Sequence, residues 1–215
     1  MNTKLFFRKS IYLPLIVVAT GLIIGGTAIS ASGDSSLTTT KVVEGKKDQF
    51  VSVETALFVP LTMVDIVPHA DSIVIGKVKE ILPAKKIQNP IAPTKESPLI
   101  CQDVIIEVER YLYGTSDSKY IAVQVNGGRV ENEVFISEIE PIFELDEKII
   151  LILGRPISYQ LDPTPEGIKP DDYFKVIASK MGKYDIEGNN VIDYSGKQYS
   201  LSSIEESITS ILQQK

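Results

Sequence analysis

The chain lacks the residues on which several kinds of functional site depend. Its 215 residues include no tryptophan, one cysteine and one histidine. Because Cys101 has no second cysteine to pair with, an internal disulfide is excluded, and one cysteine with one histidine is a poor ligand set for zinc. A Cys-His or Ser-His-Asp catalytic arrangement would need His69 beside a nucleophile, which nothing in the sequence predicts. We expect Cys101 to be a small core residue, with a reactive thiol as the alternative, and His69 to be a surface or turn-capping residue after Pro68.

Basic charge is also scarce. Lysines and arginines number 22 against 28 aspartates and glutamates, which gives a net charge of −6. Lys4, Arg8 and Lys9 are the only charged residues among the first 30, so the remainder of the chain carries −9. An acidic chain repels phosphate backbones, and basic residues interleaved with aromatic ones are absent. We therefore expect no nucleic-acid partner.

Long apolar runs are confined to the N-terminus. Ile11–Ile29 is an uncharged, mostly apolar run of 19 residues that follows the three basic residues. This pattern predicts a secretory signal peptide or an N-terminal membrane anchor over residues 1–30. The small residues of Ala28–Ser30 favour cleavage, whereas the length of the run favours an anchor. In both cases we expect the rest of the chain to be exported, extracellular or anchored to the outer face of the cytoplasmic membrane, since positive charge stays inside.

After this segment the sequence indicates a linker and one domain. Residues 31–49 are rich in serine, threonine, glycine and lysine and have no apolar period, so we expect a polar linker. Residues 50–215 are long enough to bury a substantial core and contain no internal repeat. We therefore expect a single β-barrel-like domain.

That domain is organised around Ala70–Leu82, which predicts the first long strand of a barrel. Ile73, Val74 and Ile75 are apolar on both faces, but after Gly76 only one face stays apolar. A glycine at such a change of pattern is typical of a bulge or bend, which lets one strand serve two sides of a closing barrel. The alternative is a plain central strand that tolerates its glycine.

Several other segments either alternate between apolar and polar residues or, in Lys148–Leu153, are apolar on both faces, and these patterns predict further strands. These segments are Phe50–Val59, Gln102–Tyr113, Tyr120–Val125, Lys148–Leu153, Tyr173–Lys180, Lys183–Glu187 and Val191–Tyr194.

Helical signals flank the strands. Thr62 and Asp65 resemble a capping box that opens a short helical turn before the first long strand. Ser202 or Ser203 is expected to cap a C-terminal α-helix, whose apolar stripe we expect to cover an open end or groove of the barrel. The predicted fold class is mainly β, an OB-like or Greek-key small barrel with a short helical turn and a C-terminal α-helix.

Two proline-rich segments interrupt the strands. Pro83–Ile100 and Ser158–Asp172 contain four and three prolines that a regular strand would not tolerate. We expect both to be long exposed loops, the first forming no sheet ladder.

A series of short motifs carries a resemblance. The opener Ala-Asp-x-Ile-Val-x-Gly-x-Val at Ala70–Val78 is followed by a Val-x-Ile-x-Val strand ending in Tyr-Gly at Val104–Gly114. A Val-x-Val strand into Gly127-Gly128, an apolar strand at Ile149–Leu153 and a Gly-Lys-Tyr hairpin at Gly182–Tyr184 complete it.

This order resembles a group of uncharacterised exported bacterial and archaeal proteins. In outline it is also similar to the netrin-like modules, including tissue inhibitors of metalloproteinases, whose barrel is OB-like. The resemblance covers roughly Ala70 to Tyr194 and implies a fold and a compartment. The cysteines of netrin-like modules are absent, and Asp146-Glu147 stands where Gly-Glu is expected. No inhibitory or catalytic residue is therefore carried over.

Acidic residues offer the remaining candidate chemistry. One group lies in the second proline-rich segment and could supply oxygen ligands to calcium: Asp162, Glu166, Asp171 and Asp172. A second group could supply the paired carboxylates of a hydrolase: Glu131, Glu133, Glu138 and Glu140. The alternative for both groups is an ordinary solvated surface. Gly127-Gly128-Arg129 could bind an anion but is more typical of a turn.

The leading hypothesis is a non-enzymatic extracytoplasmic binding or interaction module. Its two proline-rich loops would form one binding surface for an unknown envelope protein or small ligand. We assign no catalytic, cofactor-binding or metal-ligating residue. One alternative is a structural or assembly subunit of an envelope complex. The other is a cell-envelope hydrolase in which two or more of six carboxylates converge: Glu107, Glu109, Glu131, Glu133, Asp162 and Glu166.

Overall fold

The computed structural model describes most of the chain after the N-terminal segment. The described residues are 38–44, 50–56, 59–87, 99–114, 116, 118–156 and 165–214. The expected signal peptide or anchor, residues 88–98 of the first proline-rich segment and the beginning of the second, up to residue 164, lie outside them. Within the described residues, no helix is long and apolar enough to cross a membrane.

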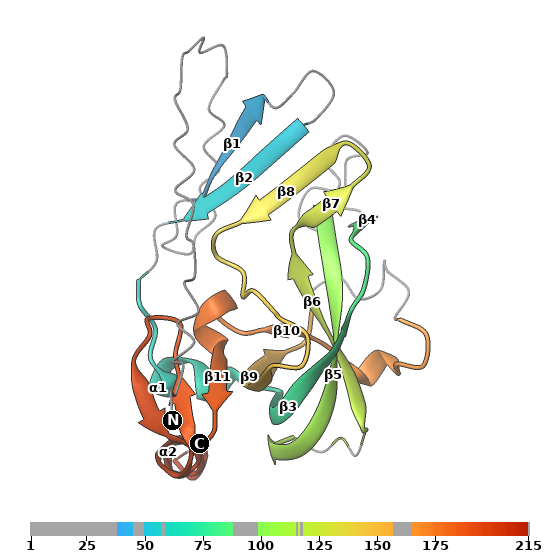
Figure 1. Cartoon of the computed structure of the whole chain (residues 1–215). Helices are drawn as coiled ribbons and strands as arrows, with labels where there is room; N and C mark the ends of the chain where they lie inside the picture. Colours follow the sequence, from blue (N-terminus) through green and yellow to red (C-terminus); the bar gives the residue numbers. More distant parts are fainter. Residues whose placement is uncertain are drawn as a thin grey trace, which may run out of the picture.

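A closed barrel of five strands forms the centre of the molecule (Figure 1). Its strands are β3 (Ser72–Ile81), β5 (Leu99–Tyr113), β6 (Tyr120–Asn126), β9 (Lys148–Gly154) and β10 (Tyr173–Val176). β10 closes the barrel by pairing in parallel with β6 and antiparallel with β9. The last strand thus lies between the third and the fourth, the Greek-key arrangement of an OB-like barrel. The predicted fold class is confirmed.

Gly76 marks a bulge in β3, as one of the two readings of the sequence predicts. The register between β3 and β5 shifts between Ile75 and Gly76. A Cβ atom at Gly76 would lie 2.6 Å from Ile106 Cγ2 and 2.8 Å from the carbonyl oxygen of Glu107. Only glycine therefore lets β3 and β5 approach so closely at the bend.

The barrel interior is a closed apolar cluster to which all five strands contribute. Its buried members are Val74, Val78, Val104, Ile106, Ile121, Val123, Val125, Ile149, Leu151, Leu153, Phe174 and Val176. Alternate residues of β3 and β9 point the other way and form a second cluster outside the barrel wall, because successive side chains of a strand face opposite sides.

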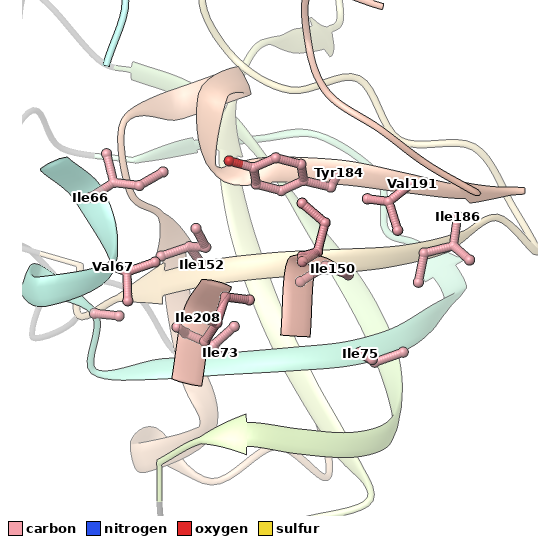
Figure 2. Packing of buried hydrophobic residues seen from close by; sticks show 12 residues of the cluster. Ile66, Val67, Ile73, Ile75, Ile150, Ile152, Tyr184, Ile186, Val191 and Ile208 are labelled. Atoms are coloured by element: carbon pink, nitrogen blue, oxygen red, sulfur yellow. The ribbon is translucent and has the colours of Figure 1, made fainter. Parts of the chain in front are cut away.

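The second cluster lies between the barrel wall and an outer layer (Figure 2). The outer layer comprises α1 (Met63–Ile66), the 3-10 helices η1 (Val67–His69) and η3 (Ser179–Gly182), the strands β11 (Lys183–Glu187), β12 (Asn190–Ile192) and β13 (Gln198–Ser200), and α2 (Leu201–Leu212). Ile73 of β3 and Ile152 of β9 meet Ile208 of α2 in this cluster. The capping box of Thr62 and Asp65 is confirmed at the start of α1.

The structure refines one expectation about α2 and corrects another. Of the two expected surfaces, an open end or a groove of the barrel, the open end is wrong: the helix packs on the outer wall of β3 and β9, because the outward residues of these central strands are themselves apolar. Its N-cap is Ser200, whose hydroxyl accepts a hydrogen bond from the Ser203 backbone N–H at 3.1 Å, and not Ser202 or Ser203. The helix begins early because β13 runs directly into it.

A four-stranded sheet lies beyond one end of the barrel (Figure 1). Its order is β1 (Thr38–Glu44), β2 (Phe50–Ala56), β8 (Glu133–Ser137) and β7 (Gly128–Val130). β1 therefore forms a strand inside the segment expected to be a linker. It pairs with all seven residues of β2, and cross-strand pairing can order a segment that has no apolar period of its own.

The proline-rich loops differ from the prediction at one point. The strand β4 (Lys85–Ile87) pairs antiparallel with the start of β5, so the first segment does form a short ladder. This is possible because its three residues lie between Pro83 and Pro90 and include no proline. In the second segment the described part ends in the 3-10 helix η2 (Pro170–Asp172).

Candidate functional site

One candidate site is a mainly apolar cleft at the end of the barrel where β3 ends and β5 begins. Ile81, Val104 and Val125 come from the barrel strands, and residues 134–137 and 140–143 form the opposite wall. We call this the mouth cleft. Its volume is about 310 Å³, at the lower end of the range of small-molecule sites, and barrel mouths are common places for such sites.

Glu140 and Asn126 are the polar pair of the mouth cleft. The Asn126 side-chain amide donates a hydrogen bond to Glu140 Oε1 at 2.8 Å. Burial raises the pKa of the Glu140 carboxyl to about 7, against smaller opposing effects of Lys175 and of hydrogen bonds from Asn126. Asn126 Oδ1 is buried and has no hydrogen-bond partner among the residues that the structure describes. A carboxyl with a strongly shifted pKa in a cleft is a candidate functional group.

The sequence alone indicates only part of this site. Glu140 belongs to the acidic group singled out above, but the structure separates it from the other three. Glu133 forms an ion pair with Lys86 at 2.7 Å, and Glu131 and Glu138 are exposed. In the sequence, Asn126 is predicted to begin a turn. No local pattern indicates that β6 places its side chain in a cleft.

A second, polar cleft of about 450 Å³ lies at the opposite end of β3. The Arg155 guanidinium lies 4.6 Å from the centre of the Phe174 ring and donates to the carbonyl oxygen of Asp171. Asp172 is almost fully buried and accepts hydrogen bonds from the Ser116 and Ser118 hydroxyls. Through these contacts, Arg155 and Asp172 connect the loops that line the polar cleft.

A polar network is buried on the outside of β5, β6 and β10. Tyr173 donates to Asp103 Oδ1 at 2.7 Å, and the Gln124 amide donates to Tyr173 Oη at 2.8 Å. Lys85 forms an ion pair with Asp103 Oδ2 at 2.6 Å. Cys101 is fully buried beside Gln124, so its predicted place in the core is confirmed.

The single histidine lies far from this cysteine. His69 is exposed at the end of η1, just before β3 begins. Cys101 pairs with Lys85 and Asn126, beyond the other end of β3. The structure therefore does not bring the two residues together.

Of the six carboxylates of the hydrolase alternative, five lie within the described residues, and neither cleft brings any two of them together. Glu107 pairs with Lys119 at 3.0 Å and Glu109 with Lys148 at 2.6 Å. None of the five described carboxylates lines the mouth cleft or the polar cleft. Asp162, which belongs both to this set and to the calcium group, lies outside the described residues. Among the residues that the structure describes, no three His, Cys, Asp or Glu side chains gather in a way that could hold a metal ion.

The two proline-rich loops leave the barrel at opposite ends of β3. The first follows Ile81, which pairs with Val104 of β5. The second follows Gly154 of β9, next to Leu153, which pairs with Ser72 at the start of β3. Neither the mouth cleft nor the polar cleft is lined by described residues of both loops. Their described parts therefore do not form one shared surface.

We compared the chain with protein-family models, curated proteins and solved structures, and it matches none of them.

Proposed function

We propose that the chain is a non-enzymatic, extracytoplasmic binding module that takes a small ligand in the mouth cleft. The observation that carries this proposal is the combination of an apolar cleft at a barrel mouth with the half-buried pair of Glu140 and Asn126. Ligand sites are typically concave and apolar with a few well-placed polar groups. The mouth cleft replaces the shared surface of the two proline-rich loops as the proposed site.

A fragment screen by NMR on the full chain with labelled isoleucine and valine methyl groups tests this function. We expect binding fragments to shift the methyl signals of Ile81, Val104, Val125 and Val134, which line the mouth cleft. The methyl groups of Ile73 and Ile152, buried outside the barrel wall, are the internal control. Fragments that shift only signals elsewhere, or a screen without binding fragments, would contradict the proposal.

The extracytoplasmic location has its own support and its own test. The basic residues followed by Ile11–Ile29, together with the resemblance to exported proteins, support export. A C-terminal fusion to alkaline phosphatase reports export, because that enzyme needs disulfides that form only outside the cytoplasm. We expect an active fusion from the full chain and an inactive one from a control without residues 1–30. Equal inactivity of both would indicate a cytoplasmic protein.

A further inference from the structure

Among the described residues that line it, the mouth cleft holds one carboxylate and no basic side chain. The carboxylate belongs to Glu140. The Glu140 carboxyl has the Asn126 amide as its hydrogen-bond donor, whereas no described residue donates to Asn126 Oδ1. Two acceptor groups therefore lie side by side at the edge of an apolar surface.

The described residues give the Glu140 carboxyl no ion-pair partner, so a ligand cation can take that place. Lys175 of β10 and Glu54 of β2 act on the Glu140 carboxyl with opposite signs. Within the described residues, Glu140 takes part in no ion pair, while the Glu54 carboxylate accepts a hydrogen bond from Ser137 at 2.8 Å. A buried carboxylate is stabilised best by a partner that brings both positive charge and hydrogen-bond donors.

We propose that the ligand of the mouth cleft is a small amine with an apolar body. Its ammonium head lies between the Glu140 carboxylate and Asn126 Oδ1, and its body covers the apolar residues Ile81, Val104 and Phe143. An ammonium group carries three donors and no acceptor, so it matches two neighbouring acceptors. A carboxylate ligand is repelled by Glu140, and an alcohol has one donor and no charge. This inference rests on the function proposed above.

Hexylammonium, hexanol and hexanoate are suitable probes because they share one apolar chain and differ in the head group. We expect hexylammonium to bind the full chain more tightly than hexanol by about tenfold or more, and hexanoate to bind most weakly. Isothermal titration calorimetry at about pH 8, where Glu140 is mostly ionised, measures the three affinities.

The matched variants are Glu140→Gln and Glu138→Gln. Glu140→Gln keeps the shape of the side chain and removes its charge, so it should lower hexylammonium affinity by about tenfold and change hexanol affinity much less. Glu138 is exposed and does not line the cleft, so its variant should bind like the wild type. For the unmodified chain, hexylammonium affinity should increase as the pH rises through about 7, whereas hexanol affinity should not change.

Three results would overturn the inference, and they separate it from the proposed function. If hexanol binds in the cleft as tightly as hexylammonium, the site is a binding site without preference for a cation. The same conclusion follows if hexylammonium affinity stays flat with pH in the unmodified chain, a measurement that does not depend on how Glu140→Gln folds. If no probe binds and the fragment screen also fails, both the inference and the proposed function are wrong.

Discussion

Gly76 shows how closely two strands approach where β3 bends. The position of a Cβ atom there is already occupied by Ile106 Cγ2 and by the backbone oxygen of Glu107. A side-chain methyl can turn aside, but the backbone oxygen belongs to a hydrogen-bonded strand and cannot. The presence of glycine at this bend therefore has a steric cause.

We predict that Gly76→Ala lowers the free energy of unfolding by about 1–3 kcal/mol, as overpacking in a core does. Urea denaturation followed by circular dichroism measures it. Lys79→Ala, at an exposed position of the same strand, is the control and should change stability by about 0.5 kcal/mol or less. Equal midpoints for both variants would show that β3 can move away from β5 without cost.

Glu140 couples the stability of the chain to pH. Its carboxyl has a pKa of about 7 in the folded chain against an ordinary value of 4.5, because burial disfavours the charged form. Between these pH values the folded chain keeps a proton that the unfolded chain releases. Its contribution to stability is therefore greatest below about pH 4.5 and is lost as the pH rises to about 7.

Glu140→Gln removes this dependence. We predict that the variant gains on the order of 3 kcal/mol relative to the wild type between about pH 4 and about pH 8, as the size of the pKa shift implies. Urea denaturation of both proteins at the two pH values measures the difference, and Glu138→Gln is the control. A difference between variant and wild type that stays constant with pH would mean that Glu140 is solvated in the folded chain.

At the scale of elements, α2 tests the outer cluster. Ile204 and Ile208 are buried against the wall of β3 and β9, while the helix is too short to persist alone in water. We predict that Ile208→Ala costs about 2–5 kcal/mol. Ser210→Ala, at an exposed position of the same helix, should cost about 0.5 kcal/mol or less. An unchanged urea midpoint for Ile208→Ala would make α2 a loose tail.

Elements with a strong local pattern could be predicted from the sequence. The apolar run of β9 and the alternation of β5 and β6 follow the rules for buried and half-buried strands, and the capping box of α1 depends on side chains three residues apart. The stripe of α2 also gave the correct helix. It could not show which surface the helix covers, because that depends on the outward faces of distant strands.

Elements that depend on pairing at a distance could not be predicted. β4 and β1 are ordered by their partners β5 and β2, and neither has a pattern of its own. The mouth cleft has the same origin, since Asn126 and Glu140 meet only when β8 and the segment after it fold over the end of β6. The burial of Asp103 likewise depends on Tyr173, 70 residues later, which donates a hydrogen bond to it.

At the scale of the whole molecule, two apolar clusters share the same strands. Leu151 of β9 points into the barrel, and its neighbour Ile152 points into the outer cluster. In the same way, Val74 of β3 belongs to the barrel interior and its neighbour Ile73 to the outer cluster. A strand cannot lose its support on one face without loosening the packing on the other, so the two clusters should unfold together.

We therefore predict a single unfolding transition for the barrel and its outer layer. Ile208→Ala weakens the outer cluster and Phe174→Ala weakens the barrel interior, the latter by about 3–5 kcal/mol. Each variant should shift urea unfolding to a lower midpoint that is identical by far-UV circular dichroism and by tyrosine fluorescence, a usable probe because the chain has 9 tyrosines and no tryptophan. If Ile208→Ala instead produces a first transition that leaves the barrel signal intact, the outer layer is a separate cooperative unit, and β3 and β9 hold the barrel together without it.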